Sequence, residues 1–299
     1  MSISTMAIAP NPSVVSMPAE PAGCLTVLDF LVCKFPHIPV ELWQQRMAEG
    51  KVHWADGTAI GPDSLFAPQQ RIFYYREVAQ EPQIPFEERI LHRDDQLLVA
   101  CKPHFLPVVP RGIYVQECLL NRLRRRTGID SLAPIHRIDR ETAGLVLFSV
   151  DPDSRGLYQR LFADGKVKKG YRAVAKLADG VRAGYRWTVA NRMVTGSPRF
   201  RMQVVDGEVN ARSEIRCVEE RDGRGLFELS PLTGKTHQLR VHMSGLGMPL
   251  LNERYYPELQ PKTPDDYSRP LQLLARNISF VDPLTGQLRE YRSERSLAW

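Results

Sequence analysis

The stretch HRIDRETAGLVLFSV, residues 136–150, sets two arginines, two acids and a histidine directly before an unbroken apolar run. The run GLVLFSV is long enough and apolar enough to be a buried strand, so HRIDRET must be a loop at the end of that strand. Loops held on a rigid sheet often carry binding and catalytic residues. The charges of this loop cannot belong to the core.

Asp139 is the central residue of this loop. It lies between Arg137 and Arg140, and a neighbouring cation should keep its carboxylate ionised and hydrogen-bonded at neutral pH. Such a group is either a nucleophile or base, or one half of a structural ion pair, and the residues alone leave both interpretations open.

Length and composition indicate a soluble globular protein. The 299 residues suggest one large domain and one small domain, and the hydrophobic content of 43% with 25% charged residues is ordinary for such proteins. No apolar run approaches the roughly 18 residues that span a bilayer. The chain has five cysteines: Cys24, Cys33, Cys101, Cys118 and Cys217. The odd number and the absence of a CxxC pair argue against a disulfide framework and fit a reducing cytoplasm.

The net charge of +6 is unevenly distributed. Residues 165–201 hold ten Lys or Arg against one acid, Asp179, with four aromatic residues among them. Clustered cations of this kind favour binding to a polyanion. A second cluster, NRLRRR at 121–126, fits either a polyanion site or a solvated face of a helix.

The order of patterns along the chain predicts a leader, a small module and a large α+β domain. Residues 1–22 lack the features of a signal peptide and are expected to be flexible. Residues 25–78 contain two helical patterns and a hairpin candidate at Asp56–Gly57, and 79–88 form a linker. From residue 89 onward, strand-like runs predict a mixed, largely antiparallel sheet with helices packed on it: 96–102, 144–150, 169–177, 185–191, 213–220, 225–232 and 273–281. Neither a GxGxxG nor a GxxxxGK[ST] motif is present, so no nucleotide cofactor is expected.

HRIDRETAGLVLF resembles the signature of the pseudouridine synthases of the RluA family, approximately HR(L/I)DRETSGLLLF, with Ala143 in place of the usual Ser. Further family signatures follow in order: LLVACKPHFLPV at 97–108, KGYRAVA at 169–175, LTGKTHQLRVHMSGLGMPL at 232–250 and LLARNISFVDPLTGQ at 273–287. The early module is similar to an S4 RNA-binding domain. The resemblance therefore implies a leader at 1–22, an S4-like module at 23–80 and a pseudouridine synthase catalytic domain at 81–299, with helices flanking a cleft.

The resemblance implies an isomerase that converts uridine in structured ribosomal or transfer RNA to pseudouridine without a cofactor or metal. Asp139 is then the catalytic carboxylate, and Arg240 is its bidentate partner. Tyr171 stacks on the flipped uracil or accepts a proton at C5, although as a strand residue it also fits an ordinary core aromatic. Arg137 is the candidate to fill the gap left by the flipped base. Four further residues are expected to bind substrate or order the site: His136, Arg140, Lys235 and His237.

Two departures from the family pattern concern the segment around Arg240. Lys235 replaces an Arg and loses its planar fork, and Leu251 and Asn252 stand where the family has Gly-Asp, which removes a carboxylate and a flexible turn residue. The helical spacing places His237 and Arg240 on one face, whereas His237 and His242 are five residues apart, which does not suit a zinc site. The second hypothesis is a non-catalytic RNA-binding or ribosome-assembly factor. A monomer is the default expectation.

Overall fold

The computed structural model describes residues 7–299 and divides into two units. The first unit contains the chain up to Pro82 together with the segment Pro110–Gln116, and the second contains Gln83–Val109 and Glu117–Trp299. The expected boundary at residue 80 lies two residues before this division, and the return of Pro110–Gln116 to the first unit has no signal in the sequence pattern.

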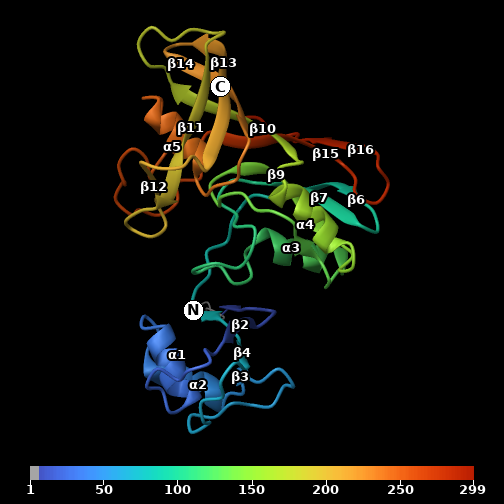
Figure 1. Cartoon of the computed structure of the whole chain (residues 1–299), viewed down its shortest axis with the longest axis vertical. Helices are drawn as coiled ribbons and strands as arrows, with labels where there is room; N and C mark the ends of the chain where they lie inside the picture. The colour runs from blue at the N-terminus through green and yellow to red at the C-terminus, as the bar shows by residue number, and fades with distance from the viewer. Residues whose placement is uncertain (1–6) are drawn as a thin grey trace, which may run out of the picture. The chain divides into compact units, whose positions relative to one another are not determined.

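The first unit contains two helices and two small sheets (Figure 1). Helix α1 (Val27–Lys34) begins at Thr26, whose side chain forms a capping box with Asp29. Helix α2 (Val40–Ala48) follows Pro39. The sheets have the orders β2 (Ser13–Ser16), β4 (Arg71–Tyr74), β3 (Val52–His53) and β1 (Ala7–Ile8), β5 (Glu77–Val78). Their core surrounds the fully buried Trp43.

The predicted flexible leader is wrong for residues 7–22, whereas residues 1–6 lie outside the described part of the chain. Strands β1 and β2 both belong to this segment, and Met17 is buried in the core of the first unit. Short strands at a sheet edge pair through their backbone, so they need little apolar alternation. The prolines on either side of β2 obscured the strand, because proline is typical of turns and linkers.

The second unit contains one sheet of eleven strands, in the order β12-β11-β13-β14-β10-β15-β9-β7-β6, with β16 added to β15 and β8 to β9 (Figure 1). Every pairing is antiparallel except that of β15 with β9. The mixed, largely antiparallel sheet is therefore confirmed. The strands are β6 (Arg89–Arg93), β7 (Leu97–Lys102), β8 (Ala133–Pro134), β9 (Ala143–Ser149), β10 (Lys168–Lys176), β11 (Arg186–Thr195), β12 (Met202–Val205), β13 (Ala211–Arg221), β14 (Arg224–Pro231), β15 (Leu273–Val281) and β16 (Leu288–Arg292).

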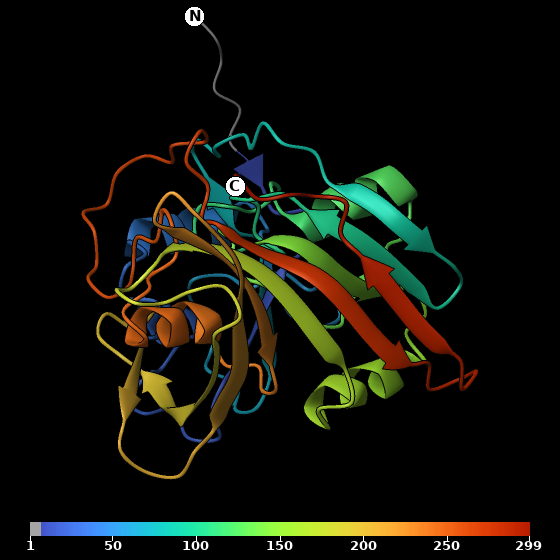
Figure 2. The same ribbon diagram turned by 90° about the horizontal axis from the view of Figure 1, so that it is seen from above.

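The parallel contact between β9 and β15 depends on Gly144. This residue has φ +114°, and a Cβ atom placed on it would lie 2.2 Å from the carbonyl oxygen of Ala275. Only glycine allows both the backbone conformation and this approach of two strands. Figure 2 shows β15, in red, running beside β10, so that β15 separates β10 from β9.

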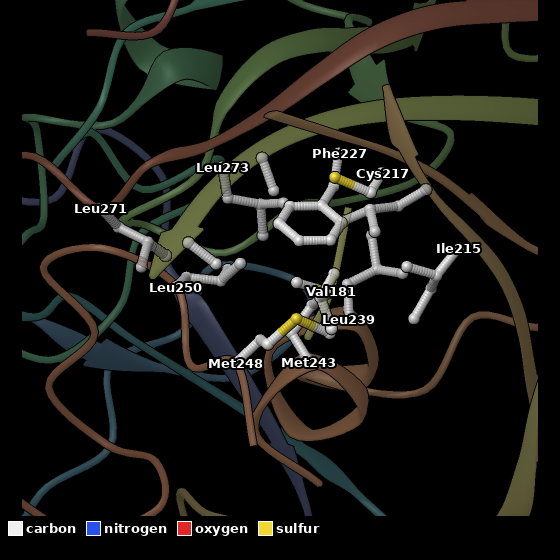
Figure 3. Close-up of a cluster of buried hydrophobic side chains, with 13 residues drawn as sticks. Val181, Ile215, Cys217, Phe227, Leu239, Met243, Met248, Leu250, Leu271 and Leu273 are labelled. Carbon is white, nitrogen blue, oxygen red and sulfur yellow. The ribbon is translucent and has the colours of Figure 1, made fainter. Parts of the chain in front are cut away.

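Three helices complete the second unit: α3 (Leu119–Thr127), α4 (Arg155–Ala163) and α5 (Gln238–Gly245). Helix α5 packs on the sheet through Leu239 and Met243, which join Phe227 of β14 and Ile215 of β13 in one buried cluster (Figure 3). This apolar contact fixes the helix that carries Arg240. Helix α4 inserts Tyr158 into a second cluster with residues of β7, β9 and β15.

The arginines of α3 are engaged within the second unit. Arg122 bonds to Glu117 and to the carbonyl of Ile84, and Arg124 bonds to the carbonyl of Leu132. Arg125 and Arg126 approach Glu117 and Glu88 within 4.0 Å and 3.7 Å. The cluster at 121–126 is thus chiefly a set of internal contacts rather than a free polyanion site. Among residues 7–299, no helix is long and apolar enough to cross a bilayer.

Replacing Gly144 with Ala should lower the free energy of unfolding by at least about 3 kcal/mol, because the substitution adds both a strained φ and a backbone clash. Urea denaturation of the purified chain measures this effect. Gly245→Ala is the matched control, since its Cβ meets nothing within 4 Å and its φ is not in the positive region. A Gly144→Ala protein as stable as the control would contradict the close approach of β9 and β15.

Candidate active site

The turn that carries Asp139 is held by its own carbonyl groups. The carbonyl of Asp139 accepts the amide of Thr142 at 3.2 Å. The next two carbonyls, of Arg140 and Glu141, accept from Lys102 Nζ at 3.0 Å and from His104 Nδ1 at 2.7 Å. Three successive carbonyls therefore have donors, which leaves this turn little freedom.

Lys102 at the end of β7 is fully buried and donates to three carbonyls, those of Pro103, Leu106 and Arg140. Burial lowers the pKa of this amine to about 7, while the charges of Glu141 and Asp139 act in the opposite direction. Three acceptors match the three N–H donors of the ammonium form. A charged residue directly after a wholly apolar strand is the sequence signal that could have identified this contact.

Arg240 lies on α5 with a side chain only 1% exposed. Its Nε and Nη2 form a bidentate pair with Glu253, in which Nε lies 2.7 Å from Oε2. Its Nη1 faces Oδ2 of Asp139 and Oε2 of Glu141, at 3.6 Å from each. Burial alone would lower the pKa of this guanidinium, but the hydrogen bond and charge of Glu253 outweigh it and raise the pKa.

His237 directly precedes α5 with φ +54°, so it lies outside the helix rather than on its face as predicted. Its side chain still meets Asp139, with Nε2 3.8 Å from Oδ1, and its Nδ1 lies 2.8 Å from the hydroxyl of Tyr256. Burial lowers the pKa of the imidazole, although the charge of Asp139 opposes this. His237 and Arg240 thus approach the two oxygens of one carboxylate.

Two tyrosines cover Arg240. The guanidinium carbon lies 4.6 Å from the ring centre of Tyr255 and 5.8 Å from that of Tyr256. Rings at this distance attract a cation and exclude water from it. Tyr255 also contacts the exposed ring of Phe200, with ring centres 5.3 Å apart.

Tyr171 lies on β10 at an irregularity of the sheet. Gly170 pairs with Asn277 of β15, whereas Tyr171 pairs with Ala275, so Arg276 is left over as the bulged residue. Burial raises the pKa of the Tyr171 phenol, and the charge of Asp139 raises it further. The ring also packs against the buried cluster beneath α5. The residue is both a core aromatic and a neighbour of the carboxylate.

The other residues expected at the site have different surroundings. The side chain of Arg137 is exposed and forms no hydrogen bond or ion pair with any residue between 7 and 299, and Lys235 is exposed in the loop before α5. The fork of Arg140 is bound to Asp265. The ring of His136 stacks on Phe162 at 4.6 Å and accepts the amide of Leu147, which gives it a contact in the core rather than beside Asp139.

The predicted loss of a turn residue and a carboxylate at Leu251 and Asn252 is wrong. Asn252 adopts φ +64°, the left-handed conformation that glycine would provide and that Asn tolerates. The carboxylate is supplied by Glu253, the next residue, which binds Arg240. Glu253 has no signal of its own in the sequence, because its role depends on the chain folding back over α5.

Comparison with known proteins gives consistent results. A family model described as RNA pseudouridylate synthase matches residues 96–245. An uncharacterized RNA pseudouridine synthase of Synechocystis is 29% identical, with 77% of this chain and 79% of that protein covered. The ribosomal large subunit pseudouridine synthase D of Zymomonas mobilis is 30% identical, with 73% and 72% covered. The structure of human RNA pseudouridylate synthase domain containing 1 has the same fold, with a TM-score of 0.58 at 22% identity over 72% of this chain and 86% of that one.

Removing the carboxylate of Glu253 should destabilise the second unit by about 3–5 kcal/mol, because a buried guanidinium then lacks its hydrogen-bonded partner. Glu253→Ala can be compared with Glu258→Ala, whose side chain is exposed. Urea denaturation of both variants checks the prediction. Equal stabilities would mean that Arg240 finds another partner.

Stability should fall with acidification partly through His136. Burial lowers the pKa of its imidazole from 6.5 to about 3, so between these values the unfolded chain binds a proton that the folded chain refuses. The destabilisation caused by His136→Gln should therefore be smaller at pH 5 than at pH 7, by up to about 2 kcal/mol. Urea denaturation at the two pH values measures this difference. An equal destabilisation at both would contradict a neutral, buried imidazole.

Proposed function

The chain belongs to the RNA pseudouridine synthase family and is an enzyme that isomerises uridine in RNA, and on this basis we propose that Asp139 is its catalytic carboxylate. The observation that carries the assignment is the geometry of this side chain. Asp139 is 21% exposed at the end of a rigid turn, and a buried arginine directs its one unbonded Nη at the carboxylate. Glu141 and Glu253, the other carboxylates facing Arg240, are both hydrogen-bonded to arginine.

The isomerisation breaks the bond between N1 of uracil and C1′ of ribose, joins C5 to C1′, and moves the proton of C5 to N1. The proposed role of Asp139 is to act on the sugar as a nucleophile or base. Arg240 directs this carboxylate, and Tyr255 and Tyr256 cover the guanidinium and keep water from it. A rigid turn suits this role, because a displacement of about 1 Å in a reacting group can cost a hundredfold in rate.

For Tyr171 we propose a stacking role on the flipped uracil. Its raised pKa keeps the hydroxyl protonated at neutral pH, so the phenol acts as a donor and an apolar surface more readily than as a base at C5. The side chain of Arg137 is exposed and has no partner in residues 7–299, and we propose that it fills the place of the extruded base. Lys235, also exposed, has the charge to contact a phosphate.

The substrate we propose is a uridine in folded ribosomal or transfer RNA of a reducing compartment such as the cytoplasm. Eight of the ten cations in residues 165–201 have no acidic partner within the described part of the chain; the exceptions are Lys166 and Arg172. Six of these eight are exposed and favour a polyanion, whereas Lys169 and Arg201 are half-buried and donate to the carbonyls of Thr233 and Pro257. In the first unit, two helices followed by β3 and β4 support an S4-like module at 23–80.

A binding factor that lacks activity is the alternative, and the buried charges disfavour it. Holding RNA needs exposed cations, whereas Arg240 and its carboxylates are buried at a cost in desolvation that binding alone does not require.

Asp139→Asn should reduce turnover by about 10²–10⁴-fold or more while RNA affinity stays about the same, because the carboxylate acts on the sugar and contributes no attraction to phosphate. The measurement is tritium release from RNA labelled at uracil C5, prepared from cells that lack this protein, together with filter binding of the same RNA. Asp130→Asn, at an exposed position, is the control. Normal turnover by Asp139→Asn would show that Asp139 is structural. If wild type bound the RNA but released no tritium, the result would favour the binding factor.

A further inference from the structure

Arg140 is bound by a segment far along the chain. Its Nη1 lies 2.6 Å from Oδ2 of Asp265 and its Nη2 lies 2.9 Å from Oδ1, across 125 residues of sequence. This bidentate pair is mostly buried, with side chains 26% and 16% exposed. Such a planar, doubly bonded pair fixes the orientation of both groups.

The segment that carries Asp265, residues 253–270, is here called the strap. It has its own internal hydrogen bonds. The carbonyl of Arg254 accepts from the amide of Gln260 at 2.8 Å, and Nη2 of Arg254 donates to Thr263 Oγ1 at 2.8 Å. Tyr267 packs edge-on against Phe105 at 5.2 Å. Asp265 lies between these two anchored points, so its position is set by the fold of the strap rather than by Arg140 alone.

The third donor of Arg140 is directed at the neighbouring acid. Its Nε lies 3.1 Å from Oε1 of Glu141. The other oxygen of Glu141 lies 3.6 Å from Nη1 of Arg240, the same nitrogen that lies 3.6 Å from Asp139. Two carboxylates therefore face one donor, and within residues 7–299 this nitrogen makes no hydrogen bond to either.

Arg140 decides which of the two carboxylates, Asp139 or Glu141, can take the Nη1 donor of Arg240. Burial opposes the charge of Glu141, but the cations of Arg140 and Arg240 outweigh it and keep the pKa of Glu141 below its ordinary value. An ionised Glu141 released by Arg140 would move toward the remaining cation, because a buried charge seeks a partner. It would then take the donor that faces Asp139.

We propose that the Arg140–Asp265 pair is a positioning device: Arg140, held by Asp265, binds Glu141 through Nε, so that Glu141 stays at 3.6 Å from Nη1 of Arg240 without forming a hydrogen bond and this donor remains available to Asp139. Both members are positioning residues, since neither needs to touch the RNA. The proposal rests on the catalytic role of Asp139 and assigns the strap a function in the same reaction. It replaces the expectation that Arg140 binds substrate, because the fork that would grip a phosphate already holds a carboxylate.

The test is steady-state tritium release by the full-length chain with the RNA that wild type modifies. Asp265→Asn should lower kcat by about 10–100-fold with KM within about twofold, because RNA contacts are intact while Asp139 loses its donor. Asp266→Asn, the adjacent exposed acid, should leave both constants unchanged. Arg140→Lys should reproduce the loss in kcat, since a lysine cannot hold Asp265 and Glu141 together.

The double variant Glu141→Gln/Asp265→Asn separates positioning from general stability. Without its charge, residue 141 no longer competes with Asp139 for Nη1 of Arg240. The kcat of this double variant should therefore be at least about tenfold higher than that of Asp265→Asn. A double variant worse than the single one overturns the proposal, as does an unchanged kcat in both Asp265→Asn and Arg140→Lys. A change confined to KM would instead identify Arg140 as a phosphate ligand. Activity in Asp139→Asn would refute the proposed function itself, whereas an inactive Asp139→Asn beside a fully active Asp265→Asn refutes only this inference.

Discussion

The need to provide donors for the backbone of one turn governs the catalytic half of this protein. The carbonyls of Asp139, Arg140 and Glu141 lie just before β9, and each accepts a hydrogen bond from within the protein. Two of the donors, Lys102 at the end of β7 and His104 in the turn that follows, come from the neighbour of β9 in the sheet. The placement of Asp139 thus follows from the pairing of two strands, and the loop itself contributes few choices of conformation.

Charge at the site is arranged so that one carboxylate is held less tightly than the others. Arg240 binds Glu253 through two of its nitrogens, and Glu141 is bound by Arg140. Asp139, by contrast, lies 3.6 Å from Nη1 of Arg240 and 3.8 Å from Nε2 of the His237 imidazole. A nucleophile or base must leave its partners during reaction, and loose contacts make this easier. The hydrogen-bonded carboxylates of Glu253 and Glu141 keep the buried Arg240 in place beside the carboxylate of Asp139, which is held less tightly.

The sequence was sufficient for the elements whose signal is local. The apolar runs from Gln96 to Val281 predicted seven strands of the main sheet, and all are present, because buried strands require continuous or alternating apolar residues. The resemblance to the family signatures, rather than a local pattern, implied that Asp139, Tyr171 and Arg240 belong to one site. What could not be predicted depends on long-range folding: Glu253 reaches Arg240 only after the chain turns back over α5, and Asp265 meets Arg140 across 125 residues of sequence. Strands β1 and β2 escaped for the opposite reason, since their pairing uses the backbone and leaves little trace in side-chain pattern.

The position of β15 has a consequence for how the protein is made. This strand is synthesised after both β10 and β9, yet it lies between them in the middle of the sheet. Until residues 273–281 have left the ribosome, the sheet exists as two separate halves, each with an unpaired edge on the side where Asp139 or Tyr171 will lie. Such edges invite pairing with other chains, and contacts so distant in sequence form slowly. The two halves of the sheet that carry Asp139 and Tyr171 are therefore joined only once this strand has been made.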